Sequence, residues 1–147
     1  DRTPPKNLRP FLNASTMAGI AFGNAGCAAV HALAYPIGAI YHVPHGKANY
    51  LVFEKVFAAY KKLNADLSPL ETLLAGILKC PQTHVWKELF VFLDRVFTRQ
   101  PLRELSVDEK KCLEMAASVV QSQQRLLGNN PVPLSQEVVA EVYKDCL

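Results

Sequence analysis

Residues 11–33, FLNASTMAGIAFGNAGCAAVHAL, decide the fold that this sequence predicts. The segment is rich in Ala and Gly, and Gly is a poor helix former in water. Small side chains in such a run let other backbones come close, which favours a buried central helix. Asn13 or Ser15 is expected to cap the start of this helix, and Pro36 with Gly38 is expected to end it.

Helical spacing continues beyond this segment. After a second proline break, apolar residues recur at helical intervals from residue 45 to about 62. Ser68 and Glu71 form the pattern of a capping box, with Pro69 at the first helical position, so another helix is predicted there.

Three more helices are predicted in the C-terminal half. Thr83 is expected to cap a segment whose LFVFL core has the composition of a strand, although its ends favour a helix. Ser106 and Glu109 form a second capping box before a helix that runs to Leu127, and Ser135 starts a last one. The sequence therefore predicts an all-α fold of six or seven helices.

Length, charge and cysteine usage narrow the class of protein. The chain has 147 residues, 50% of them hydrophobic, which suits one globular domain. Its net charge of +3 comes from 16 basic and 13 acidic residues without a long basic run, which argues against a nucleic-acid partner. The four cysteines are far apart and are expected to be reduced thiols in a cytoplasmic protein. Neither a signal peptide nor an 18-residue apolar run is recognised, so no membrane partner is expected.

The first ten residues, DRTPPKNLRP, differ from the rest. They contain three prolines and no initiator Met. We interpret residues 1–10 as a linker or a truncated entry, and residues 11–147 as a single helical domain.

Three of the four histidines lie in residues 31–49, HALAYPIGAIYHVPHGKAN. His31 and His45 are 14 residues apart (45 − 31 = 14) with two turns between them, so they can point at one centre from different elements. Neutral imidazole is a good ligand for Fe²⁺ and Zn²⁺. Spacing alone still favours core or capping histidines over metal ligands.

The wider context resembles the signature of the iron-containing alcohol dehydrogenases. That signature reads roughly G-x-x-F-x-N, six residues, H-x-x-x-H-P-x-G and, about six residues later, P-H-G-x-A-N. The matching positions in this sequence are Gly19, Phe22, Asn24, His31, Pro36, Gly38, Pro44, His45, Gly46, Ala48 and Asn49. The remainder of the chain resembles the helical C-terminal domain of the family in layout.

The resemblance implies an NAD-linked enzyme that holds one divalent ion, Fe²⁺ or Zn²⁺, through an aspartate and three histidines. His31 and His45 match the last two histidine ligands, so residues 11–147 would be a metal-binding domain with half of the site. The other ligands and an N-terminal nucleotide-binding domain would precede this chain. The expected partners are that domain, a small alcohol substrate and possible further copies in a homo-oligomer.

Tyr35 departs from the family pattern, which has a second histidine at this position, often assigned to proton transfer. A tyrosine donates a hydrogen bond but is a poor base at pH 7. With its neighbours, Tyr35 makes the segment most similar to the 4-hydroxybutyrate dehydrogenase branch, which acts on a short alcohol with a carboxylate tail. Tyr35 and His42 are the catalytic candidates, although a loop or cleft-lining role is favoured for His42.

Three more residues are candidates for binding the substrate. Lys47 is either a solvated lysine or a ligand of the substrate carboxylate. Phe22 and Asn24 match positions near the active cleft of the family, although Phe22 would also suit a core.

Two classes of function follow from the sequence. The leading hypothesis is the C-terminal part of a metal-dependent alcohol dehydrogenase, inactive by itself. The alternative is a non-enzymatic helical interaction module, or a truncated relative that retains the motif. A zinc-dependent polyol dehydrogenase of the same superfamily is a third reading.

Overall fold

The computed structural model describes residues 6–147, and within them it contains eight α-helices, two short 3₁₀ helices and no strand. The prediction of an all-α fold is confirmed. The helices are α1 (Arg9–Ala25), α2 (Ala29–Tyr41), α3 (His45–Lys62), α4 (Ser68–Leu78), α5 (Val85–Val96), α6 (Glu109–Ser122), α7 (Gln124–Leu127) and α8 (Gln136–Lys144), with the 3₁₀ helices η1 (Gln82–His84) and η2 (Leu102–Leu105).

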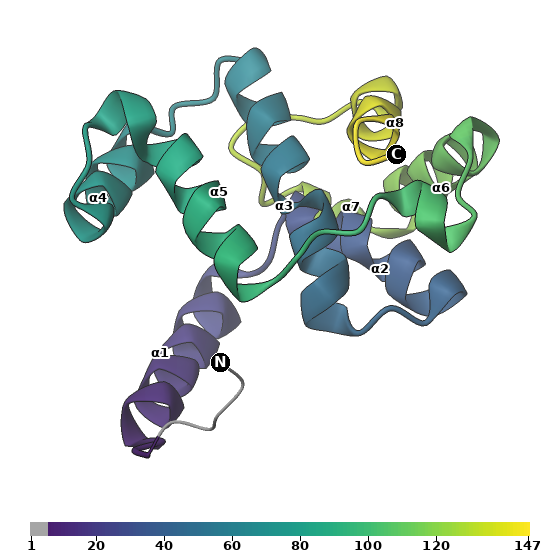
Figure 1. Ribbon diagram of the computed structural model, residues 1–147. Coiled ribbons are helices and arrows are strands. Elements are labelled where there is room, and N and C mark those ends of the chain that lie inside the picture. The colour runs from purple at the N-terminus through teal and green to yellow at the C-terminus, as the bar shows by residue number, and fades with distance from the viewer. Residues whose placement is uncertain (1–5) are drawn as a thin grey trace.

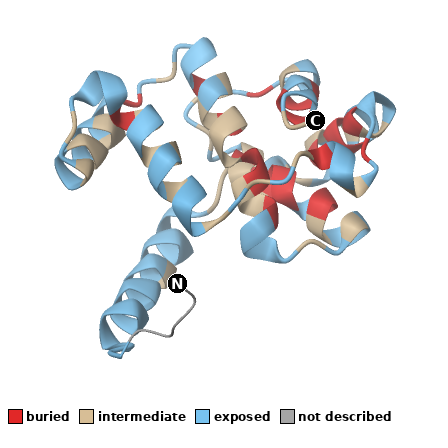
Figure 2. Cartoon of the chain, in the orientation of Figure 1, coloured by how far each residue is buried: buried red, intermediate tan, exposed pale blue. Residues whose placement is uncertain are grey.

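The core lies where α2, α3, α6 and α8 meet (Figures 1 and 2). α2 packs against α3 and α6, and α8 packs against α3 and α6. The largest side chains that are fully buried there include Leu33, Val52, Val119 and Tyr143. α4 and α5 pack on each other at one side of this core and contribute few buried residues.

Residues 11–33 do not form the single central helix that we expected. They are divided between α1 and α2, whose axes differ in direction by 106°. The break falls at Gly26, which has a φ of 79°, and a Cβ there would lie 2.5 Å from Nδ2 of Asn129. Only glycine fits such a position. α2 is the central helix, whereas α1 projects from the core and has no buried residue (Figures 1 and 2).

The start of α1 also differs from the prediction. The helix begins at Arg9, and Pro10 stands in its first turn, where a missing N–H costs nothing. The side chain of Asn7 accepts a hydrogen bond from the N–H of Arg9 at 3.1 Å. Asn13 and Ser15 lie inside the helix and do not cap it.

α2 continues through Pro36 and Gly38, which the sequence predicted to end it. The helix ends at Tyr41, and His42 adopts the left-handed conformation. A proline inside a helix disturbs the hydrogen bonds of the preceding turn. The carbonyl of Leu33, in that turn, accepts a hydrogen bond from the hydroxyl of buried Tyr143 at 2.7 Å. The carbonyl that loses its donor to Pro36 is that of Ala32, so the Tyr143 bond ties α2 to α8 one residue beyond the interruption.

Two predicted capping boxes do not form. The Ser68 hydroxyl donates to Asp66 at 2.6 Å, and Glu71 accepts instead from the indole N–H of Trp86 at 2.5 Å. Ser106 is left-handed, and Asp108 caps α6 by accepting from the N–H of Lys111 at 2.8 Å. In both places an aspartate, a stronger acceptor than a serine hydroxyl, binds the nearby donor.

The predicted Thr83 cap is wrong, because Thr83 lies within η1 and α5 has no side-chain cap. Two other helix predictions are confirmed. Ser135 caps α8, and the LFVFL core is helical within α5. The helix that we expected to reach Leu127 is interrupted at Gln123, which separates α6 from the short α7. No single helix in the described part of the chain is long and apolar enough to cross a membrane, and α1 with α2 meets that test only as a sharply bent pair.

Candidate metal centre

The connection between α2 and α3 brings His31 and His45 together. His31 lies in the first turn of α2, and His45 is the first residue of α3, directly after Pro44. Because α2 and α3 pack against each other, the chain reversal at residues 42–44 returns His45 to His31. The two imidazole centroids are 5.0 Å apart, with ring planes inclined by 51°.

Tyr35 joins this pair from the next turn of α2. Its ring centroid lies 6.2 Å from that of His45, and its side chain is 45% exposed. Tyr35 therefore lies partly exposed beside the imidazole of His45.

The environment of His31 favours the neutral imidazole. Burial lowers the pKa of His31, and the nearby His45 lowers it further. Neutral imidazole is the form that ligates a metal ion. His31 is thus poised to offer a nitrogen lone pair at neutral pH.

Asn49 positions His45. It lies one turn further along α3, and its Nδ2 is 3.2 Å from Nε2 of His45. Its Oδ1 is buried and has no hydrogen-bond partner among the described residues. Sequence reasoning included Asn49 in the motif but gave it no role. The spacing of four residues after a helical histidine was the available signal.

The histidine pair fits two ligands of one ion. Two imidazoles bound tetrahedrally at about 2.1 Å place their centroids about 5 Å apart, close to the observed 5.0 Å. No group of three or more His, Cys, Asp or Glu side chains within residues 6–147 has the geometry of a complete metal site.

The other candidate residues lie apart from the pair. The ammonium group of Lys47 lies 5.0 Å from the ring centroid of Phe97. Phe22 and Asn24 lie on the projecting α1, where Phe22 is 56% exposed and Asn24 donates to the carbonyl of Ile20 at 2.7 Å. His42 is exposed at the end of α2. The structure brings Tyr35 to the histidines and does not bring these residues into contact with them.

Two asparagines from a distant part of the chain fix the start of α2. Oδ1 of Asn130 accepts from the N–H of Ala29 at 2.9 Å and from the hydroxyl of Tyr60 at 2.6 Å. Nδ2 of Asn129 donates to the carbonyl of Cys27 at 2.9 Å. These bonds hold the turn that carries His31. Sequence reasoning missed them, because no local pattern connects residues 101 positions apart.

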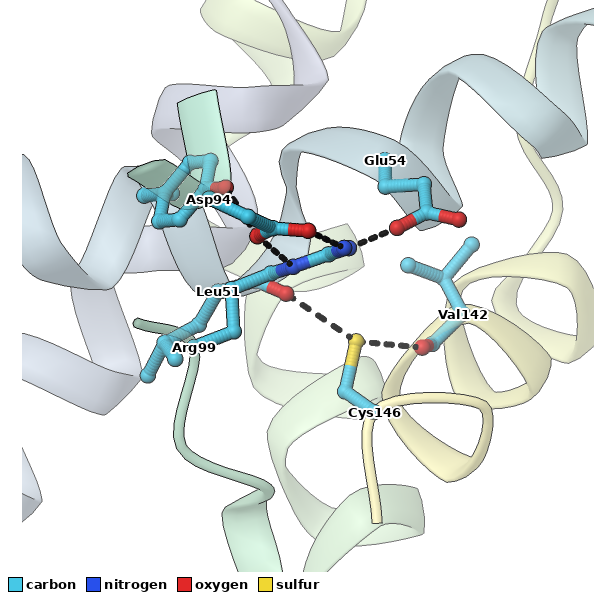
Figure 3. Close-up of polar contacts among 7 residues, drawn as sticks. Leu51, Glu54, Asp94, Arg99, Val142 and Cys146 are labelled. Carbon is cyan, nitrogen blue, oxygen red and sulfur yellow. Dashed lines mark hydrogen bonds and ion pairs between the residues drawn. The ribbon is translucent and has the colours of Figure 1, made fainter. Parts of the chain in front are cut away.

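A second polar cluster joins α3, α5 and the C-terminus away from the histidines (Figure 3). Arg99 donates to both carboxylate oxygens of Asp94, at 3.0 and 2.9 Å, and pairs with Glu54. Asp94 also accepts from the hydroxyl of Tyr50 at 2.6 Å. Glu54 is nine residues after His45 on α3, or about 14 Å along the axis.

Cys146 belongs to the same region and is not poised to react. Its thiol contacts the carbonyls of Val142 at 3.1 Å and Leu51 at 3.5 Å (Figure 3). Burial raises the pKa of Cys146 to about 12. The thiol therefore stays protonated at neutral pH, and all four cysteines are free.

Comparison with known proteins identifies similar chains. Residues 6–147 match the model of the Fe-containing alcohol dehydrogenase family, C-terminal. The chain is 48% identical over 139 residues to 4-hydroxybutyrate dehydrogenase of Clostridium kluyveri, covering 93% of this chain and 38% of that protein. It is 31% identical over 145 residues to long-chain-alcohol dehydrogenase 1 of Geobacillus thermodenitrificans, covering 91% and 35%.

A solved structure of 1,3-propanediol oxidoreductase has the same fold. It superposes with a TM-score of 0.71 at 25% identity, over 91% of this chain and 36% of that chain. The chain therefore spans little more than a third of the length of each of these three proteins.

Proposed function

The chain belongs to the Fe-containing alcohol dehydrogenase family, as its C-terminal part, and on that premise we propose that it supplies half of the metal site of an NAD-linked alcohol dehydrogenase. The single observation that carries the proposal is the His31–His45 pair with centroids 5.0 Å apart. The remaining ligands and the nucleotide-binding domain would come from a preceding part of the polypeptide.

The proposed chemistry assigns separate tasks to the residues of this chain. His31 and His45 would hold Fe²⁺ or Zn²⁺, which polarises the alcohol oxygen as a Lewis acid while the alcohol carbon loses a hydride to NAD. Asn49, with its amide oxygen turned to accept from Nε2–H of His45, would keep Nδ1 of that ring facing the ion. The hydroxyl of Tyr35 would donate a hydrogen bond to the substrate. The contacts in the described part of the chain assign no defined step to Lys47 or His42, and their roles stay predictions.

The proposed substrate is a short alcohol with a carboxylate tail, such as 4-hydroxybutyrate. Support comes from the 48% identity to a 4-hydroxybutyrate dehydrogenase and from Tyr35, which replaces the usual histidine. Other similar proteins are named for 1-propanol and for long-chain alcohols. These names share the oxidation of an alcohol and differ in which alcohol it is.

The test uses the longer polypeptide that contains this chain, assayed by NADH absorbance with 4-hydroxybutyrate and by metal analysis. His45→Ala should lose the bound metal and lower turnover at least a thousandfold, because a ligand and its polarising ion are removed. Tyr35→Phe should keep the metal and lose about tenfold, the effect of one hydrogen bond.

His84→Ala is the matched control, since His84 lies on η1, outside the candidate site. It should retain both metal and turnover. Normal turnover and metal content in His45→Ala would contradict the ligand assignment. The 147-residue chain alone should be inactive, and measurable turnover by it would contradict the proposal that it carries only half of the site.

A non-enzymatic binding module is the second candidate, favoured by the exposed apolar surface of α1. If the longer polypeptide binds metal but oxidises none of the tested alcohols, this alternative gains.

A further inference from the structure

A cavity of about 460 Å³ lies between α3 and α5, away from the histidine pair. Its walls include the aromatic rings of Phe57, Trp86 and Phe90. Glu54, the lining residue of α3 nearest to His45 along the helix, is nine residues after it, or about 14 Å along the helix axis. The cavity is thus separate from the candidate metal centre.

The aromatic floor is held in place before any ligand binds. The rings of Phe57 and Trp86 have centroids 4.9 Å apart, and Trp86 stacks on Phe90 at 6.2 Å. The indole N–H of Trp86 donates to Glu71 at 2.5 Å. The indole face is therefore fixed in orientation, and apolar carbon can pack against it.

The charged groups divide between the two ends of this cavity. Lys61 lies 5.9 Å from the ring of Trp86, the neighbour of Lys87, so the two lysines mark one end. Arg99 joins Glu54 to Asp94, so the two acids mark the other. On each helix the acid and the base are seven residues apart (61 − 54 and 94 − 87), or about 10 Å along the axis. A cationic end and an anionic end thus face each other across an apolar trough.

Existing pairs leave one unit of charge at each end. Arg99 pairs with both Glu54 and Asp94 (Figure 3), so that trio carries a net charge of −1. Lys61 pairs with Glu71 at 3.2 Å. Lys87 has no ion-pair partner among the described residues and leaves +1 at its end. The complementary ligand therefore has one cation and one anion, separated by an apolar chain.

We propose that this cavity binds a free ω-amino carboxylate, with its carboxylate at Lys87 and Lys61 and its ammonium group at Asp94 and Glu54. The methylene chain lies along the rings of Trp86 and Phe90, between the two charged ends. A chain of four to six carbons spans the trough with a hydrogen bond at each end. This ligand site is independent of the dehydrogenase function proposed above.

The single tryptophan of the chain provides the assay, because Trp86 forms the floor of the cavity. Titration of the 147-residue chain with 5-aminovalerate should change Trp86 fluorescence with millimolar or tighter affinity. Pentanoate and pentylamine, which each lack one charge, should bind at least tenfold more weakly. Equal affinity for pentanoate would overturn the proposal. An unchanged Trp86 fluorescence at about 50 mM 5-aminovalerate would overturn it too.

Variants test the placement of the ligand. Lys87→Gln should weaken 5-aminovalerate binding about tenfold and abolish the preference over pentylamine. Lys110→Gln, which removes an exposed lysine of α6, should leave binding unchanged. Unchanged binding by Lys87→Gln would overturn the proposal. Nα-acetyl-lysine carries the same two charges as the C-terminal lysine of a peptide. If it binds tenfold more tightly than 5-aminovalerate, the occupant is a C-terminal lysine and the proposal of a free amino acid is wrong.

Discussion

His31 shows how packing prepares a single residue for ligation. Its imidazole is half-buried on α2 and faces a second imidazole, and both features disfavour the charged form. The same features reduce stability in acid. In the unfolded chain His31 regains its ordinary pKa of 6.5, so the unfolded state binds more protons below that pH.

The pKa of His31 tests this account. His45→Gln removes the second cause and should raise the pKa of His31 part of the way towards 6.5, because burial, the larger cause, remains. The measurement is an NMR titration of the imidazole resonances. His84→Gln should have no effect on that pKa. An unchanged pKa in His45→Gln would show that the two rings do not interact.

Stability against pH follows from the same shift. The free energy of unfolding should be greatest above pH 6.5 and should fall as the pH drops through 6.5 towards the lowered pKa. His31→Gln should remove that part of the dependence, as measured by urea unfolding at pH 7.5 and 5.5.

At the scale of elements, Asn130 connects the start of α2 to α3. Its Oδ1 accepts from Ala29 and Tyr60, and the Tyr60 side chain is 97% buried (3% exposed). Asn130→Ala should lower the free energy of unfolding by about 2–4 kcal/mol, because two donors lose their acceptor. Urea unfolding measures the loss.

Asn130→Asp is the matched variant. It keeps the acceptor and adds negative charge near the N-terminus of α2, where the helix dipole favours it. Nδ2 of Asn130 has no partner among the described residues, so replacing it removes no bond. We expect less than half of the loss seen with Asn130→Ala. Equal losses in the two variants would show that shape, and not hydrogen bonding, matters at this position.

The helix ends show which parts of the fold can be predicted from sequence. Ser135 was predicted correctly because its acceptor role depends on the N–H three residues later. Ser68 was predicted incorrectly because Asp66 accepts from its hydroxyl and from its N–H, the donor that Glu71 would bind in a capping box. Pro36 was taken as a helix end because the packing that holds this part of α2, including the bond from Tyr143 to Leu33, comes from more than 100 residues away. Local patterns succeed where the deciding contact is local.

The candidate site also has parts that depend on local sequence and parts that depend on long-range contacts. His31 and His45 came from a short motif, and the expectation that they can point at one centre agrees with their centroid distance of 5.0 Å. Their role as metal ligands stays a prediction. Asn129 and Asn130, which hold the turn before His31, had no sequence signal because they act across the chain.

At the scale of the whole molecule, the apolar side chains of α1 are exposed, although such side chains are usually buried. Phe11, Leu12, Met17, Ile20 and Phe22 are each between 56% and 71% exposed. A helix that is apolar on all sides is normally buried. The relatives are nearly three times as long as the matched region. The expectation of a buried helix was therefore wrong for the 147-residue chain, and we propose that it holds for the longer polypeptide.

Hydrogen exchange tests this proposal. In the 147-residue chain the amides of α1 should exchange at rates near those of an unfolded peptide, because an isolated 17-residue helix rich in Ala and Gly is marginal in water. In the longer polypeptide the same amides should slow at least a hundredfold as the preceding part covers the helix. The amides of α2 should be protected in both, which provides the internal reference.

A double substitution tests whether the preceding part of the longer polypeptide packs directly on the apolar side chains of α1. Met17→Glu with Ile20→Glu should leave the unfolding free energy of the 147-residue chain within about 0.5 kcal/mol, because both side chains are already exposed. In the longer polypeptide the same pair should cost about 3 kcal/mol or more, since two carboxylates would enter an apolar contact. If the pair costs nothing there, or if α1 exchanges equally fast in both forms, the preceding part does not pack on α1, and its apolar surface must serve another partner.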